Sequence, residues 1–140
     1  MQFLIRVLLV LSAAVFLVPE PSGASIIFRP GQKAEYVPPG EEAISGNAAE
    51  IYQSAQTAEK EGNLKRAIRA YKTLVKRHPK DGLAPTALYR AAQLQEQTRQ
   101  YTPAADSYLQ LVERYSSSAH FDDAIEGQFR VGEIYLNGKK

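Results

Sequence analysis

Few side chains in this chain could do chemistry, and their spacing assembles no catalytic site. His78 and His120 are the only histidines, and both fall where we expect helix ends, where imidazole meets terminal carbonyls or water. The chain has no cysteine, which excludes a disulfide framework, a thiolate zinc site and a cysteine nucleophile. Adjacent carboxylates such as Asp122 and Asp123 do not face each other on a helix. We therefore predict a protein that is not an enzyme, with no catalytic residue, metal site or cofactor.

A row of basic residues is the clearest charge pattern, and it recurs at helical spacing: Lys65, Arg69, Lys72 and Lys76. The simpler interpretation is a solvated outer helix face. The functional interpretation is contact with an anionic membrane or an acidic partner, since polybasic faces gain about 1 kcal/mol per charge at anionic lipid. The net charge of +2 gives no reason to expect nucleic acid binding, which calls for a strongly basic surface.

Residues 1–24 have the features of a secretory signal peptide. Arg6 precedes an apolar run over 7–18, which is too short to span a membrane because a spanning helix takes about 20 residues. Small residues at 22–24 offer a cleavage site before Ser25. The alternative is an uncleaved membrane anchor, which the two prolines after the apolar run disfavour. Export without cysteine suits a bacterial periplasm, where we expect the protein to reside.

Residues 25–47 interrupt any helical periodicity and predict an extended arm rich in proline and glycine. Pro30–Gly31 and Pro38–Gly40 punctuate the segment, and proline both fixes its backbone angle and lacks an amide donor. The segment 25–28 is expected to be loosely held, with pairing as a short strand or packing on the helices as alternatives.

Residues 48–138 alternate helical stretches with short breaks, which predicts five helices of about 12–16 residues in antiparallel pairs. Asn63 is expected to cap the second helix, and Pro85 to lie in the first turn of the third. Thr102 followed by Pro103 repeats this cap-then-proline signal for the fourth helix. The breaks are expected at 61–63, 78–82, 116–118 and 137–138.

The helices recur as copies of one another. Ala67 and Ala104 lie 37 positions apart, and the same shift places Tyr71 on Tyr108. It also aligns Ile51 with Leu88, Ala55 with Ala92, Leu64 with Tyr101, Leu74 with Leu111 and Arg77 with Arg114. A partial third copy puts Gly132 at the position of Ala55 and Ala92. Self-similarity at this period indicates stacked helix pairs, in which small residues permit close helix contact and the tyrosines fill the space between pairs.

This pattern resembles the tetratricopeptide repeat (TPR), in which a small residue in the first helix is followed by Ala-x-x-x-aromatic in the second. The matching residues are Ser54–Ala55, Ala67, Tyr71 and Pro79 in the first copy, Ala91–Ala92, Ala104 and Tyr108 in the second, and Val131–Gly132 and Tyr135 in the third. The resemblance implies an all-α solenoid of about two and a half repeats, over 48–82, 83–118 and 119–138.

Longer phrases over 67–79 and 104–116 are similar to the BamD-like outer-membrane assembly proteins. That resemblance implies a periplasmic scaffold for β-barrel insertion, with assembly components or their clients as partners. The chain lacks the lipidated cysteine of that family, so we expect any outer-membrane association to be without lipidation. It also ends midway through a third repeat, whereas that family typically has five. The alternatives for this chain are therefore a fragment, a truncated paralogue or a short adaptor. The alternative function is an exported TPR adaptor that organises cell-envelope or cell-division complexes.

The first helices of TPR folds line a concave groove, which implies a partner-binding row in this chain. By repeat alignment the row comprises Tyr52, Gln56 and Lys60, then Tyr89, Gln93 and Gln97, then Phe129 and Glu133. Each copy carries an aromatic ring with an amide or acid about one turn further on. Such a ladder could hold an extended peptide, with the rings as anchors. The alternative is that the rings pack within the superhelix.

Apolar side chains spread around the last helix instead of forming one stripe, and they include Phe121, Phe129 and Ile134. A terminal repeat helix normally has a polar outer face. The pattern therefore predicts a missing helix, a dimer or a docked partner at this end.

Overall fold

The computed structural model describes residues 25–27, 35–37 and 43–138. The predicted signal peptide and most of the predicted arm lie outside the described residues. The chain divides into two units, residues 1–39 and 40–140. In the first unit, β1 (Ser25–Ile27) pairs antiparallel with β2 (Glu35–Val37), with Ile26 opposite Tyr36. Of the alternatives for 25–28, the short strand is therefore what Ser25–Ile27 forms.

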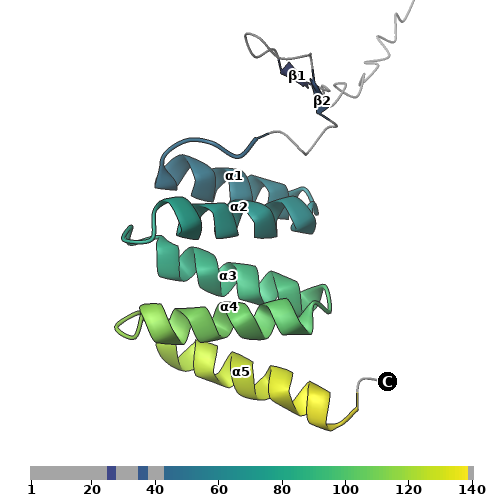
Figure 1. The fold of residues 1–140 in the computed structure, drawn as a ribbon, viewed down its shortest axis with the longest axis vertical. Helices are drawn as coiled ribbons and strands as arrows, with labels where there is room; N and C mark the ends of the chain where they lie inside the picture. The colour runs from purple at the N-terminus through teal and green to yellow at the C-terminus, as the bar shows by residue number, and fades with distance from the viewer. Residues whose placement is uncertain (1–24, 28–34, 38–42, 139–140) are drawn as a thin grey trace, which may run out of the picture. The chain divides into compact units, whose positions relative to one another are not determined.

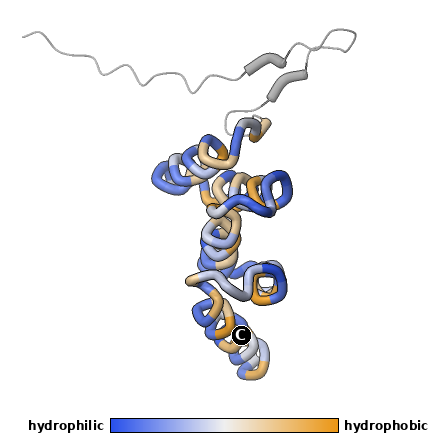
Figure 2. The backbone as a smooth tube through the Cα atoms, turned by 90° about the vertical axis from the view of Figure 1, so that its left-hand side faces the viewer, coloured by the Kyte–Doolittle hydropathy of each residue, from blue (hydrophilic) through white to orange (hydrophobic). Residues whose placement is uncertain are grey.

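The second unit is a stack of helices in which each helix packs on the next (Figure 1). They are α1 (Ala48–Lys60), α2 (Leu64–Arg77), α3 (Ala84–Gln97), α4 (Tyr101–Arg114) and α5 (Phe121–Leu136). Each helix carries both hydrophilic and hydrophobic residues (Figure 2), as a helix with one face in a core must. The predicted helical repeat fold is confirmed. None of the helices that the described residues form is long and apolar enough to cross a bilayer.

Local side-chain contacts explain where the first two helices begin. Asn47 and Glu50 form a capping box at α1, in which each side chain accepts a hydrogen bond from the other residue's backbone amide at 3.0 Å. Asn63 caps α2 as predicted, accepting from the amide of Arg66 at 3.1 Å. Such caps satisfy amides that have no partner inside the helix.

The predicted cap of the fourth helix is wrong, because α4 begins one residue before Thr102. Gln100 precedes the helix and makes no side-chain capping bond. Pro103 is the third helical residue, where its missing amide costs nothing because the first amides of a helix have no intrahelical partner. Thr102–Pro103 therefore lies inside the first turn and does not mark its boundary.

The turn between α3 and α4 is unusual because a non-glycine residue, Arg99, adopts a left-handed backbone with φ of 59°. Gly62 holds the equivalent place after α1, with φ of 77°. Both turns close with a six-to-one hydrogen bond, from Asn63 to Ala58 at 2.8 Å and from Gln100 to Gln95 at 2.7 Å. The two turns therefore share one backbone conformation. Only the first turn has a glycine at the left-handed position, where glycine adopts positive φ without steric cost.

Arg99→Gly is expected to raise the free energy of unfolding by about 0.5–1 kcal/mol, because left-handed backbone costs an L-residue roughly 1–2 kcal/mol and glycine's entropy loss offsets part of the relief. The reciprocal change, Gly62→Ala, is expected to lower it by about 1 kcal/mol. Urea unfolding of both variants measures the two effects. A stability change of the same sign in both would contradict the equivalence of the turns.

The core lies between the helices and combines aliphatic side chains with small residues and two tyrosines. Ala55, Ala67, Ala92 and Ala104 are fully buried, as predicted for close helix contacts; Tyr71 and Tyr108 are also buried, as predicted for side chains that fill the space between pairs. The expectation for Gly132 is wrong within the described residues, since a Cβ built there meets no atom within 4 Å. The close approach on α5 is at Gly127, where a Cβ would lie 2.5 Å from the Tyr108 ring.

Candidate protein-binding site

A cluster of three polar side chains joins the first repeat to the second. The Tyr71 hydroxyl donates to Glu59 Oε2 at 3.1 Å, and Arg90 Nε on α3 donates to both oxygens of the same carboxylate at 3.0 and 3.1 Å. Arg90 Nη2 also contacts Glu59 Oε1. The guanidinium hydrogen bond is the main reason that the pKa of Glu59 is lowered from its ordinary value. Burial, followed by the charge of Glu59, raises the pKa of the Tyr71 phenol.

The same cluster is built again one repeat further on. The Tyr108 hydroxyl donates to Glu96 Oε2 at 3.0 Å, and Arg130 on α5 donates to the two Glu96 oxygens at 2.6 and 2.9 Å. The hydrogen bond from Arg130 is again the main cause that lowers the pKa of the carboxyl. Each cluster anchors the first helix of one repeat to the pair before it by a charge-assisted, two-point contact.

Sequence reasoning missed these clusters, although the signal was present. Glu59 and Glu96 are separated by the same 37 positions as Tyr71 and Tyr108, and Arg90 aligns with Arg130 in the copy that carries Gly132. Apart from Arg77 and Arg114, the repeat alignment used apolar, aromatic and small residues, which identify the core. Polar residues that recur at the same spacing as the core residues indicate contacts between repeats.

The first three predicted groove residues come together in one pocket. Tyr52, Gln56 and Lys60 on α1 line it together with the first cluster. The Tyr52 ring meets the Tyr71 ring edge-on, with centroids 5.5 Å apart, while Gln56 and Lys60 are exposed. The pocket therefore has a partly buried aromatic wall and exposed polar groups at its mouth.

The second set divides between packing and surface. Tyr89 is half-buried, tilted against Tyr108 at 6.2 Å and stacked on His120 at 4.6 Å with the planes 10° apart. Gln93 accepts from Arg90 Nη1 at 2.9 Å. Gln93 and Gln97 line a second pocket with the residues Glu96, Tyr101, Arg130 and Ile134. Tyr52 and Tyr89 thus take part in packing between helices, which is the alternative that the sequence left open, while the amides lie at the pocket surface.

The third set is the most open. Phe129 is 73% exposed, and Glu133 lines a pocket with Arg99, Tyr101 and Arg130. Arg130 also borders the second pocket, so the pockets follow one another from α1 to α5. We call this row of pockets, together with the exposed Phe129 on α5, the first-helix face. Tyr135 and Leu136, at 45% and 88% exposure, confirm that apolar side chains on α5 are uncovered by the described residues.

The chemistry of this face suits recognition of a polypeptide. It offers exposed amides at Gln56 and Gln97, and carboxylates and guanidinium groups that hydrogen bonds hold in the two clusters, beside partly exposed rings. Amides satisfy the backbone of a bound segment and rings anchor its side chains. Within the described residues, no three histidine or carboxylate side chains gather as metal ligands would.

The stacked helix pairs form an α-solenoid that carries this row of pockets. A family model described as tetratricopeptide repeat matches residues 51–81 and 86–118. The chain therefore carries two tetratricopeptide repeats, which correspond to α1–α2 and α3–α4. Repeats of this kind generally bind other proteins or peptides. No curated protein matches the chain.

Proposed function

We propose that this protein is an exported, periplasmic scaffold that holds extended segments of partner proteins on its first-helix face, in the assembly of outer-membrane β-barrels. The observation that carries the proposal is the row of pockets from α1 to α5, each bordered by Arg90 or Arg130. A row of similar pockets suits an extended chain, which presents successive side chains at a regular rise.

The setting of this function is supported by the sequence. The features of residues 1–24 favour export, and the phrases over 67–79 and 104–116 resemble BamD-like proteins. An adaptor for cell-envelope or cell-division complexes uses the same face with different partners. The two are separated by which proteins co-purify with the chain from its host, barrel-assembly components or cell-wall enzymes.

The face is tested by truncating residues whose loss leaves the core intact. A variant with Gln56→Ala, Gln97→Ala and Phe129→Ala is expected to lose at least about tenfold in affinity for the co-purified partner, because exposed anchors carry much of the energy of an interface. Binding is measured by surface plasmon resonance with the purified partner.

Leu109→Ala is the matched control, because Leu109 is an apolar residue at 45% exposure on α4. It is expected to bind as the unaltered protein does. Undiminished binding by the triple variant would refute the role of the first-helix face.

A further inference from the structure

A second groove lies on a different surface, between α2 and α4. Its floor contains Ile68 and Val75 of α2 and Leu88 and Gln95 of α3, and its far wall is formed by α4. Its volume of about 730 Å³ falls within the roughly 300–1,000 Å³ typical of ligand clefts. It is thus deep enough to take the side chains of a bound partner.

The groove is strongly basic on one side. Lys65, Arg69, Lys72 and Lys76 form the α2 rim, and Arg114 adds a further cation on α4. None of the residues of the described chain that line the groove is acidic. Lysine stems are apolar while their heads are charged, so the rim provides both aliphatic walls and cations. The α4 side adds the neutral amides of Gln110 and, just before the helix, Gln100.

We infer that this groove binds an acidic amphipathic helix of another protein. From Lys65 to Lys76 the rim covers eleven helical steps, about 16 Å at 1.5 Å per residue. A partner helix of three turns along α2 would face these cations with carboxylates on one edge. Its apolar edge would meet Ile68, Val75 and the lysine stems, as in helix-in-groove recognition.

The shape of the groove favours a helix over a membrane surface. Ile68 and Val75 are 8% and 4% exposed, so the apolar floor is recessed behind charged side chains. A flat bilayer buries apolar groups that protrude from a helix. The side chains of a partner helix, in contrast, can enter the groove and contact Ile68 and Val75 on its floor. The charge is complementary to carboxylates, which makes an acidic peptide the occupant that satisfies both floor and rim.

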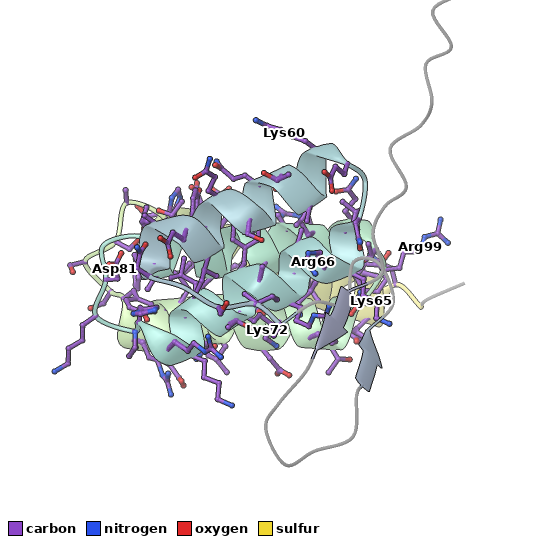
Figure 3. The ribbon with its side chains drawn as sticks, turned by 90° about the horizontal axis from the view of Figure 1, so that it is seen from above. Lys60, Lys65, Arg66, Lys72, Asp81 and Arg99 are labelled. Atoms are coloured by element: carbon purple, nitrogen blue, oxygen red, sulfur yellow. The ribbon has the colours of Figure 1, made fainter. Side chains whose placement is uncertain are left out.

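This site is separate from the first-helix face. Viewed from above, Lys60 projects from the α1 edge of the stack, whereas Lys65 and Lys72 lie toward the opposite edge (Figure 3). The residues that line the groove include none that line the three pockets of the first-helix face. The two surfaces can therefore hold different partners at the same time. The inference about the groove does not depend on the proposed function of the first-helix face.

A pair of synthetic peptides tests the inference. One is a fluorescent helical peptide with glutamate at positions i, i+4, i+7 and i+11 and an alanine–leucine face beside them; the other has glutamine at those positions. Fluorescence polarisation with the full chain is expected to give at least about tenfold tighter binding of the acidic peptide, weakening as salt is added. Equal binding of both peptides, or binding of neither, would overturn the inference.

Two variants separate charge from shape. Lys65→Gln/Lys72→Gln/Lys76→Gln is expected to weaken binding of the acidic peptide by about tenfold or more. Gln110→Trp fills the groove from α4 without changing charge and is expected to weaken it similarly. Circular dichroism checks that each variant is folded. If Gln110→Trp binds as before, the groove is not the site.

The matched control for Lys65→Gln/Lys72→Gln is Arg66→Gln/Lys80→Gln, which removes the same number of charges at positions that line neither the groove nor the first-helix face. The groove pair is expected to lose at least about fivefold in affinity, and the control pair to bind within about twofold of the unaltered chain. Equal loss in the two pairs would mean unspecific attraction and contradict the inference. Vesicles with phosphatidylglycerol provide the membrane arm. If the protein sediments with these vesicles in a way that depends on the groove lysines, and the peptide does not bind, the groove binds lipid and the inference of a helical partner is wrong.

Discussion

Gly127→Ala is expected to lower the free energy of unfolding by about 2 kcal/mol, within the roughly 1–3 kcal/mol that overpacking costs. The added Cβ would lie 2.5–2.7 Å from three ring carbons of Tyr108. That ring is fully buried and tied by its hydroxyl to Glu96, so it cannot swing away. The sign is diagnostic, because glycine to alanine inside a helix otherwise stabilises by about 1 kcal/mol. Urea unfolding monitored by circular dichroism measures the effect.

The control lies in the same helix. Gly132 has open space around its Cβ position, so Gly132→Ala is expected to stabilise the protein by about 0.5–1 kcal/mol. In a Tyr108→Ala background, Gly127→Ala should also stop being destabilising, since the atoms it strikes are gone. Additive effects of Gly127→Ala and Tyr108→Ala would show that the ring is not the obstacle.

Tyr71→Ala is expected to lower the free energy of unfolding by about 3–5 kcal/mol, as for other large buried aromatic residues. The ring is buried between the first and second helix pairs, and its removal also takes a hydrogen bond from Glu59. Tyr71→Phe keeps the ring and loses only that bond, with an expected cost of about 1 kcal/mol, since Glu59 retains Arg90. Urea unfolding of the two variants separates packing from hydrogen bonding.

An exposed residue serves as the control for this pair. Leu136 is 88% exposed, and Leu136→Ala is expected to change stability by no more than about 0.5 kcal/mol. If Tyr71→Phe proved as harmful as Tyr71→Ala, the hydrogen bond to Glu59, and not the filled space, would hold the repeats together.

Most of the helical architecture could be predicted from sequence because its signals are local. Asn63 as a cap and Pro85 in a first turn depend on neighbours within one turn, and the buried alanines were visible because they recur in the repeat. The start of α4 was mispredicted because the left-handed turn at Arg99 ends α3 and lets the next helix begin earlier. Arginine gives no sequence sign of that backbone, whereas Gly62 does.

The candidate site could be predicted only in part, because side-chain partners across repeats are not local. Helical periodicity placed Tyr52 and Tyr89 on the first helices, but it could not show that Tyr52 meets Tyr71 or that His120 stacks on Tyr89. The basic row on α2 was also visible in the sequence. Its position beside a groove was not, since the groove exists only because α3 sits beneath α2 and α4.

Site-specific photo-crosslinking in the host tests the central claim that the first-helix face binds protein partners. A photoreactive residue is placed at Gln56 or Gln93, with Asp106, an exposed position on α4, as the control. We predict one and the same partner protein crosslinked from both Gln56 and Gln93 and none from Asp106. Crosslinks absent from both positions, or equally strong from Asp106, would contradict the account.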